Sequence, residues 1–317
     1  MLISNLKSIV RENSKDKKIF LRNLLKEQLQ YYLLDFIYSS DWGSRFLFKG
    51  GTCLRFCFDL PRLSEDSDFD IQDYDNFDLK EFCQEIENHF TKNLQIKNFN
   101  LKVAGNGQQI FLRFPIMEEL GLQDNSTQSN VLFLRLDIQG VDSNIYEEEV
   151  SLISKADFNF IIRRYRLTDL FSSKIAAILT RSFKKGKDDR ITFKGRDYFD
   201  LIWFLEKGVS PNFERLEDIT GFDKNTVSQK LDENVSLVNI KYLREDLLPL
   251  FASQKFVADF CENFKKLYEK HRCPKCNSIF TYLKGSRGVG AGSETALPKI
   301  TEENYYCAVC GEALKKR

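Results

Sequence analysis

The sequence predicts an α+β protein in which a mixed sheet precedes a helical region and a small cysteine-paired tail. Strand-like runs occur between residues 64 and 165, without the regular crossover helices of a Rossmann-type sheet. Helical patterns dominate from Thr168 onward, and four cysteines in two close pairs lie near the C-terminus. We therefore expect a core domain over 1–165, a helical region completing the active site over 166–270, and a metal ribbon over 271–317.

The first part begins with apolar residues at helical spacing over 16–39, which predict an amphipathic helix packed on a sheet. A short strand over 46–49 runs into Gly50-Gly51, and these glycines open a helix that ends before Pro61. Asp78 is a favourable N-cap for a helix reaching residue 92. The remaining expected strands cover 64–71, 101–103, 109–114, 131–139 and 158–165, with a hairpin turn at 105–107.

The second part is expected to be helical, and a glycine-rich loop interrupts the tail. The predicted helices cover 168–184, 196–207 and 238–270, with a charged loop over 184–194. The loop over 285–293 lies between the two cysteine pairs.

The composition is that of an ordinary folded protein, with 42% hydrophobic and 29% charged residues. The net charge of +1 gives no global attraction to nucleic acid or membrane. We expect no membrane segment, because apolar stretches of about 18 residues are absent. The N-terminus does not resemble a signal peptide, so a cytoplasmic location is expected. In that reducing compartment, cysteines are thiols or metal ligands more often than disulfides.

Two short motifs in the first part carry the chemistry of a phosphate and metal site. Gly50-Gly51 before a helix leaves backbone N–H groups open to a phosphate, and Thr52 could add a hydroxyl donor. Asp66 and Asp68 are two residues apart, so on a strand both carboxylates lie on one face. Such a pair can bind one Mg²⁺ or bridge two.

Asp137 is a candidate third carboxylate, near the end of the apolar strand Leu132–Ile138. If this strand lies beside the strand with Asp66 and Asp68, three carboxylates meet. Nucleotidyl transfer requires that arrangement, because metal ions assist both the attacking hydroxyl and the leaving pyrophosphate. The alternative is that Asp137 is a strand-end residue facing water.

These motifs resemble a known family. Gly50-Gly51-Thr52 together with Arg62-x-Ser64-Glu65-Asp66-x-Asp68-Phe69 resembles the signature of the AbiEii/AbiGii nucleotidyltransferase toxins. That family belongs to the polymerase-β-like nucleotidyltransferase superfamily and supplies the toxin of abortive-infection toxin–antitoxin pairs used in phage defence. A second similar block is Leu170-Phe171-Ser172-Ser173-Lys174-Ile175-Ala176-Ala177-Ile178-Leu179-Thr180-Arg181, followed by Lys194-Gly195-Arg196-Asp197-Tyr198-Phe199-Asp200-Leu201. The resemblance covers about residues 20–208.

The resemblance implies a polymerase-β-like core that uses an NTP and Mg²⁺ or Mn²⁺. It implies that metals are held by Asp66, Asp68 and Asp137. It implies further catalytic roles for Lys174 and Asp197. The nucleotide-binding residues that follow from it are Gly50, Gly51, Thr52, Arg62, Lys174, Arg181 and Arg196.

Structural interpretations of the second block stay open. Lys174 could be a solvated lysine of an amphipathic helix. Arg181 and Arg196 could form salt bridges with Asp197 or Asp200, and Asp200 is more often a structural partner than a catalyst.

The four paired cysteines predict a structural metal site. Cys273-Pro274-Lys275-Cys276 and Cys307-Ala308-Val309-Cys310 are both Cys-x-x-Cys, and four thiolates form a closed tetrahedral Zn²⁺ site. The alternative is two free or redox-active dithiols. Surrounding cations could hold a phosphate backbone, or could be a solvated surface offset by nearby glutamates. They are Lys270, Arg272, Lys275, Lys284, Arg287, Lys299, Lys315, Lys316 and Arg317.

The leading function hypothesis is transfer of a nucleoside monophosphate from an NTP to a hydroxyl of RNA, such as a tRNA, or of a protein. A cognate antitoxin is an expected partner, and a membrane is not. One alternative is a catalytically silent protein of the same fold that binds nucleic acid or antitoxin. Another is a small-molecule nucleotidyltransferase, which would need no basic ribbon.

Overall fold

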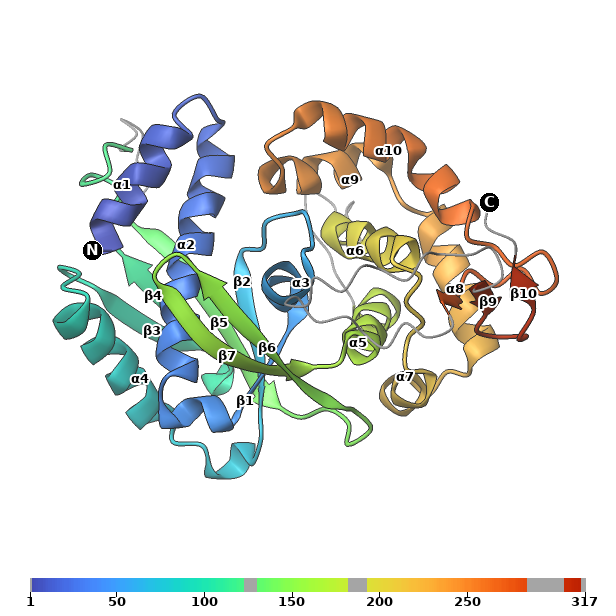
Figure 1. Cartoon of the computed structure of the whole chain (residues 1–317), viewed down its shortest axis with the longest axis horizontal. Helices are drawn as coiled ribbons and strands as arrows, with labels where there is room; N and C mark the ends of the chain where they lie inside the picture. The colour runs from blue at the N-terminus through green and yellow to red at the C-terminus, as the bar shows by residue number, and fades with distance from the viewer. Residues whose placement is uncertain (1, 123–129, 182–192, 284–304, 315–317) are drawn as a thin grey trace. The chain divides into compact units, whose positions relative to one another are not determined.

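The protein divides into two compact units, drawn in Figure 1. The computed structural model describes residues 2–122, 130–181, 193–283 and 305–314. The first unit contains residues 1–141 and 150–164, and the second contains residues 142–149 and 165–317. The expected loops over 184–194 and 285–293 lie largely or wholly outside the described residues.

Within the described residues, the first unit is built on a seven-stranded mixed sheet with the order β3-β4-β5-β2-β1-β7-β6. Strands β2 and β5 are parallel, as are β1 and β7, whereas the β1–β2, β3–β4 and β4–β5 pairs are antiparallel. This confirms the predicted α+β class with a mixed sheet. The strands are β1 (Phe46–Lys49), β2 (Asp66–Ile71), β3 (Asn100–Ala104), β4 (Gln109–Phe114), β5 (Leu132–Gly140), β6 (Glu148–Lys155) and β7 (Phe158–Tyr165).

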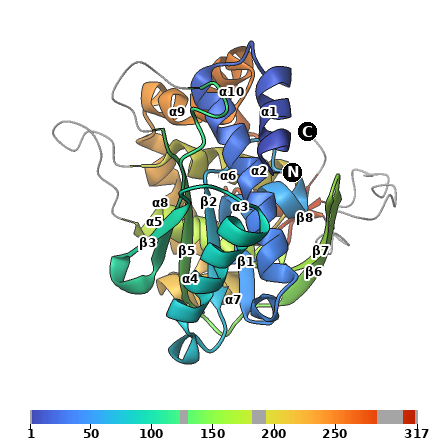
Figure 2. The same cartoon turned by 90° about the vertical axis from the view of Figure 1, so that its left-hand side faces the viewer.

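Helices cover one face of this sheet, because alternate strand residues on that face are apolar. Figure 2 shows α2 (Lys18–Tyr38) and α4 (Leu79–Asn88) in front of the strands. Phe46 of β1 lies 4.9 Å from Phe82 of α4 between ring centroids. The predicted cap is confirmed, since the Asp78 side chain accepts a hydrogen bond from the Glu81 backbone N–H. The opposite face of β2 and β5 carries the acidic residues.

Several elements were not predicted. Helix α1 (Leu2–Glu12) precedes α2, and strand β6 forms an edge of the sheet. The expected helix over 238–270 is wrong as one element: it is α9 (Ile240–Leu247) and α10 (Gln254–Glu269). The short turn Leu248–Leu250 separates them, because Pro249 has no backbone N–H to continue α9.

The second unit is helical, as predicted, and carries a small sheet near the C-terminus. Its further described helices are α5 (Leu167–Thr180), α6 (Gly195–Glu206), α7 (Phe213–Thr220) and α8 (Lys224–Ser236). The buried Arg215 side chain donates hydrogen bonds to the carbonyls of Ser143 and Ile145 and pairs with Asp142. These contacts hold the segment 142–149 within this unit.

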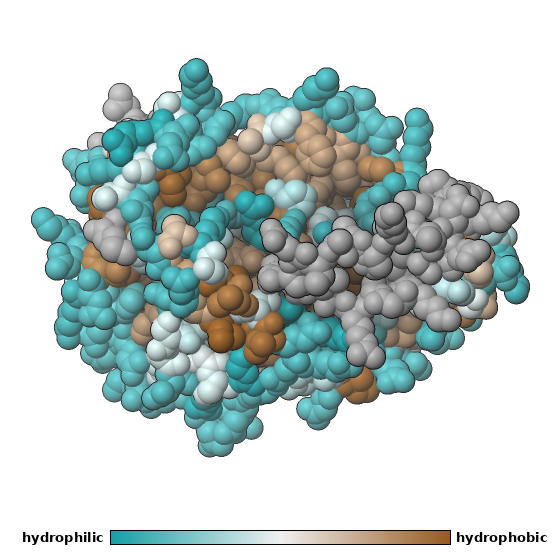
Figure 3. All heavy atoms as spheres, viewed as in Figure 1, coloured by the Kyte–Doolittle hydropathy of each residue, from teal (hydrophilic) through white to brown (hydrophobic). Residues whose placement is uncertain are grey.

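The outer face of the β6–β7 ribbon is apolar and exposed. Val150, Leu152 and Ile161 are 64%, 60% and 57% exposed. An apolar patch lies over these strands in Figure 3. In the described part of the chain, the helices are all too short or too polar to cross a membrane.

Candidate active site and cysteine cluster

The register of two parallel strands brings the three predicted carboxylates to one place. Asp68 of β2 lies directly opposite Asp137 of β5, and Asp66 lies opposite Arg135. Because side chains alternate along a strand, Asp66, Asp68 and Asp137 share one face of the sheet. The side chains of Asp66 and Asp137 are 19% and 26% exposed, so they are half-buried yet open to a ligand.

The two glycines allow a helix to begin against these carboxylates. Helix α3 (Gly50–Phe58) starts directly after β1. Gly50 has a φ of +76°, and a Cβ there would lie 2.1 Å from Oδ2 of Asp68. A Cβ at Gly51 would lie 2.6 Å from Nη2 of Arg62. Only glycine therefore permits this approach of the helix N-terminus to Asp68.

The side chains of Thr52 and Arg62 are both used within the fold. Thr52 is fully buried, and its hydroxyl donates to the backbone carbonyl of Asp66. Arg62 is 1% exposed, and its Nη1 donates to the Leu63 carbonyl at 2.9 Å. The Thr52 bond holds the start of β2 against the start of α3, and the Arg62 guanidinium lies against Gly51 at the same turn.

Arg135 belongs to the site although the sequence analysis assigned it no role. Its Nη2 lies 2.7 Å from Oδ2 of Asp66 and 3.0 Å from Oδ2 of Asp137. One guanidinium therefore bridges two carboxylates that would otherwise repel each other. A signal was present: Arg135 is two residues before Asp137 in an apolar strand, so it shares the Asp137 face.

The donor set of this face fits a hard divalent cation. Carboxylate oxygens are preferred ligands of Mg²⁺, and Asp66, Asp68 and Asp137 are all only partly buried. Among the described residues, the cysteine cluster of the tail is the group whose ligand atoms lie close enough together to surround one ion. The carboxylates are spaced more widely, with Arg135 between two of them.

In the second unit, Lys174 joins two acidic residues of helix α6. Its Nζ lies 2.8 Å from Oδ1 of Asp197 and 2.9 Å from Oδ2 of Asp200. The exposed fractions of the three side chains are 12%, 8% and 0%, so Lys174 is not a solvated surface lysine. Burial raises the pKa of Asp197, but the charge of Lys174, aided by Arg196 and Arg181, outweighs it and lowers this pKa to about 2.

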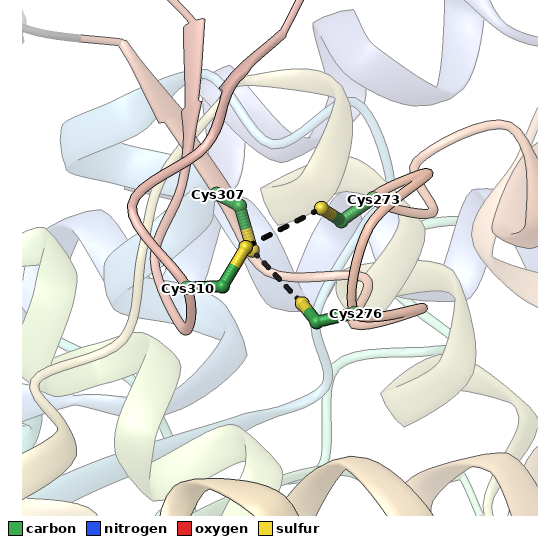
Figure 4. A group of neighbouring side chains, drawn as sticks. All are labelled: Cys273, Cys276, Cys307 and Cys310. Carbon is green, nitrogen blue, oxygen red and sulfur yellow. Dashed lines mark hydrogen bonds between the residues drawn. The ribbon is translucent and has the colours of Figure 1, made fainter.

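The four cysteines of the tail converge on one point, as Figure 4 shows. Their sulfur atoms all lie within 4.8 Å of one another. The Cys273–Cys310 and Cys276–Cys307 sulfur pairs are 3.6 Å and 3.5 Å apart. Four sulfurs bound to one Zn²⁺ at about 2.3 Å stand roughly 3.8 Å apart, so the cluster is a candidate metal site. Strands β8 (Thr281–Leu283), β9 (Tyr305–Cys307) and β10 (Ala313–Leu314) form the surrounding sheet.

The described cations of the tail are all paired with acids. Lys270 pairs with Glu206, and Lys275 pairs with Glu312 at 2.9 Å. Arg272 pairs with Asp232 and Glu269. These residues form a charge-balanced surface rather than an open basic patch. The remaining cations of the predicted basic group, Lys284, Arg287, Lys299, Lys315, Lys316 and Arg317, lie outside the described residues.

The first prediction concerns Gly50. Gly50→Ala should lower the free energy of unfolding by about 1 kcal/mol more than Gly221→Ala, because the new Cβ must displace the Asp68 carboxylate. Gly221 is the matched control: its φ is +71°, but a Cβ there has no atom within 4 Å. Urea denaturation of both variants measures the difference. Equal destabilisation by the two substitutions would contradict the close approach of Gly50 to Asp68.

The second prediction concerns the pH dependence of the Lys174–Asp197 pair. The folded pKa of about 2 lies below the ordinary value of 3.8, so the ionised carboxylate stabilises the fold above pH 4. This contribution is lost as the pH falls toward 2. The free energy of unfolding of the wild type should exceed that of Asp197→Asn by about 2 kcal/mol at pH 7 and by about half of that at pH 3. Urea denaturation at both values tests this, and a constant difference would contradict it.

Comparison with known proteins identifies the family. The sequence matches the family described as nucleotidyl transferase AbiEii toxin, type IV TA system, over residues 32–266. Curated proteins give no match. A candidate nucleotidyltransferase from H. pylori is 16% identical, with 78% of this chain and 95% of that chain covered and a TM-score of 0.41. JHP933 from Helicobacter pylori is 16% identical, with 78% and 92% covered and a TM-score of 0.40. Because the family match over residues 32–266 covers well more than half of this chain, the chain belongs to the AbiEii nucleotidyl transferase toxins of type IV toxin–antitoxin systems.

Proposed function

We propose that this protein transfers a nucleoside monophosphate from an NTP to an acceptor hydroxyl, with Mg²⁺ or Mn²⁺ held by Asp66, Asp68 and Asp137. The observation that supports this most is the register in which Asp68 of β2 faces Asp137 of β5, with Asp66 on the same face. Two neighbouring parallel strands thus present three hard oxygen donors. A bound metal pair would assist the attacking and leaving oxygens of the displacement.

The residues around the carboxylates supply binding and charge. The backbone N–H groups at the start of α3, from Gly50 to Thr52, are available to the triphosphate at a helix N-terminus. The buried Arg62 guanidinium lies against Gly51 in that turn, so its contribution to nucleotide binding is made through the backbone. Arg135 bridges Asp66 and Asp137 and can turn toward a phosphate once a metal neutralises the carboxylates.

The charged group of the second unit has a separate role in this proposal. Lys174 contacts the nucleotide, and Asp197 and Asp200 are positioning residues that hold its ammonium in place. The low pKa of Asp197 keeps this acid ionised at any pH at which the protein works. Arg181 and Arg196 act first through their charge on Asp197, and they are secondary candidates for nucleotide contact.

The acceptor in this proposal is RNA, such as a tRNA, with a protein hydroxyl as the second candidate. Family membership implies an NTP substrate and a cognate antitoxin. Purified protein incubated with each labelled NTP, Mg²⁺ and either total RNA or lysate separates the hypotheses. Label in RNA supports the leading one, and label in a protein band supports the second. Label in small molecules would indicate a small-molecule enzyme, and no label would favour a silent binding protein.

The third prediction is that Asp66→Ala or Asp68→Ala abolishes transfer while the protein remains folded. Both side chains are partly exposed and lie among like charges, so their removal relieves repulsion. Label transfer measures activity and thermal unfolding measures stability. Asp75→Ala is the matched control, because this exposed carboxylate follows β2 but lies outside the cluster. Full activity of a folded Asp66 or Asp68 variant would refute the mechanism.

We also propose that Cys273, Cys276, Cys307 and Cys310 bind one structural Zn²⁺. The backbone N–H of Glu312 donates to Cys310 and lowers the pKa of this thiol to about 7, which favours a thiolate there, whereas burial raises the pKa of Cys276 and Cys307. All four positions of a tetrahedral ion are then filled by sulfur, so this zinc has no open position for catalysis. Its function is to hold the tail folded, because so short a segment buries little apolar surface by itself.

The fourth prediction is that purified protein contains about one zinc per chain. Elemental analysis by mass spectrometry should show the loss of this zinc in the Cys273→Ser, Cys307→Ser double variant. Cys83→Ser is the control, since Cys83 is a buried thiol of α4 outside the cluster, and it should retain the metal. Wild-type protein that contains no zinc would contradict the proposed site.

A further inference from the structure

A second feature lies on the carboxylate face of the sheet, beside the candidate active site. Strands β3, β4 and β5 present a hollow of about 380 Å³ lined by Lys102, Ala104, Phe111, Arg113 and Phe133. We call these five residues the aromatic–basic shelf. The volume lies within the range of pockets that bind small molecules or single groups of larger ligands.

The register places the shelf next to the carboxylates. Phe111 of β4 lies opposite Arg135, and Gln109 lies opposite Asp137. Phe133 is on β5, an even number of residues before Asp137, so both side chains point to the same face. The shelf therefore continues the active-site surface across two neighbouring strands, within a single rigid sheet of the first unit.

The side chains of the shelf combine two kinds of contact. Phe133 is 38% exposed, and the guanidinium of Arg113 lies 5.6 Å from the centre of its ring. Lys102 lies opposite Phe111 on the edge strand β3. Among the described residues, neither Lys102 nor Arg113 has an acidic partner, in contrast to the paired cations Lys270, Arg272 and Lys275 of the tail.

We propose that the shelf binds the end of a single-stranded RNA acceptor, with a base stacked on Phe133 or Phe111 and the backbone phosphates near Lys102 and Arg113. Exposed aromatic rings with unpaired cations are the surface that single-stranded nucleic acids require, because every base has a face that stacks. This proposal rests on the proposed nucleotidyl transfer, whose acceptor hydroxyl it would place beside Asp137. A protein acceptor has no comparable need for stacking rings.

The test is direct binding of fluorescein-labelled, eight-nucleotide oligouridylate and oligoadenylate to the full chain. Phe133→Ala should raise the dissociation constant about tenfold through lost stacking. Arg113→Gln should reduce the slope of log affinity against log salt concentration by about one, the value expected for the loss of one phosphate contact. The Asp66→Ala, Asp68→Ala double variant should still bind. Double-stranded RNA of the same length should bind more weakly, because its bases are already stacked and paired.

Matched controls separate the shelf from nonspecific effects. Ile161→Ala removes an exposed apolar side chain from β7, which is separated from the shelf by β2 and β1. Lys207→Gln removes an exposed cation that lies 5.5 Å from the ring of Trp203. Both should bind the oligonucleotides as wild type does. Thermal unfolding verifies that each variant is folded.

The outcomes distinguish this proposal from the proposed activity. Binding that depends on Phe133 and Arg113 in a protein without transfer activity would support the shelf and refute the enzyme. Transfer activity combined with binding that is indifferent to both substitutions would refute the shelf alone. Absence of oligonucleotide binding, with label transferred to a protein, would show that the acceptor is a protein and overturn the shelf.

Discussion

The candidate active site depends on like charges held together by the backbone. Asp66, Asp68 and Asp137 are brought onto one face by the parallel pairing of β2 and β5, and carboxylates so placed repel each other. The hydrogen bonds of the strands and the buried apolar residues on the opposite face, such as Leu136 and Phe69, oppose this repulsion. Arg135 reduces it further by bridging Asp66 and Asp137. The sheet thus supplies the stability that keeps these three carboxylates together.

The same constraint explains the conformation around Gly50. Helix α3 begins close beside the Asp68 carboxylate, and a side chain at Gly50 would occupy the position of that carboxylate. The Thr52 hydroxyl then binds the Asp66 carbonyl, which holds α3 to β2, and the buried Arg62 guanidinium lies against Gly51. The residues of this motif therefore divide into two kinds: glycines that let the backbone approach Asp68, and buried side chains that hold the backbone.

The sequence predicted the parts of this protein that depend on local spacing. The Asp66–Asp68 pair, the Asp78 cap and the two Cys-x-x-Cys pairs all follow from short-range geometry. Contacts between segments that are distant in the sequence could not be predicted in the same way. Asp197 and Asp200 are three apart, so a shared helix face was readable, but their joint contact with Lys174 depends on how α5 packs against α6.

The edge strand β6 and two polar contacts near the carboxylates were not predicted from the sequence, for related reasons. Strand β6 has charged residues at both ends, which masks the alternation that marks a strand. The partner of the Thr52 hydroxyl likewise could not be predicted from the sequence, because a threonine after two glycines can donate to a phosphate as well as to a buried carbonyl. Arg135 is a second polar residue on the Asp137 face of an apolar strand, and its contacts with both Asp66 and Asp137 depend on the pairing of β5 with β2.

The cysteine tail supports the helix that carries Lys174. Phe280, between the two cysteine pairs, is fully buried and lies 5.3 Å from Phe213 of α7 and 6.3 Å from Phe171 of α5, measured between ring centroids. Phe171 also stacks on Phe204 of α6 at 4.3 Å. Lys174 is one helical turn after Phe171, and its partners Asp197 and Asp200 are on α6. An ordered tail therefore packs Phe280 against α5, the helix that carries Lys174, and Phe171 connects this contact to α6, which carries Asp197 and Asp200. The cysteine cluster at the C-terminus thus has a physical route to the geometry of a charged group that lies far from it in sequence.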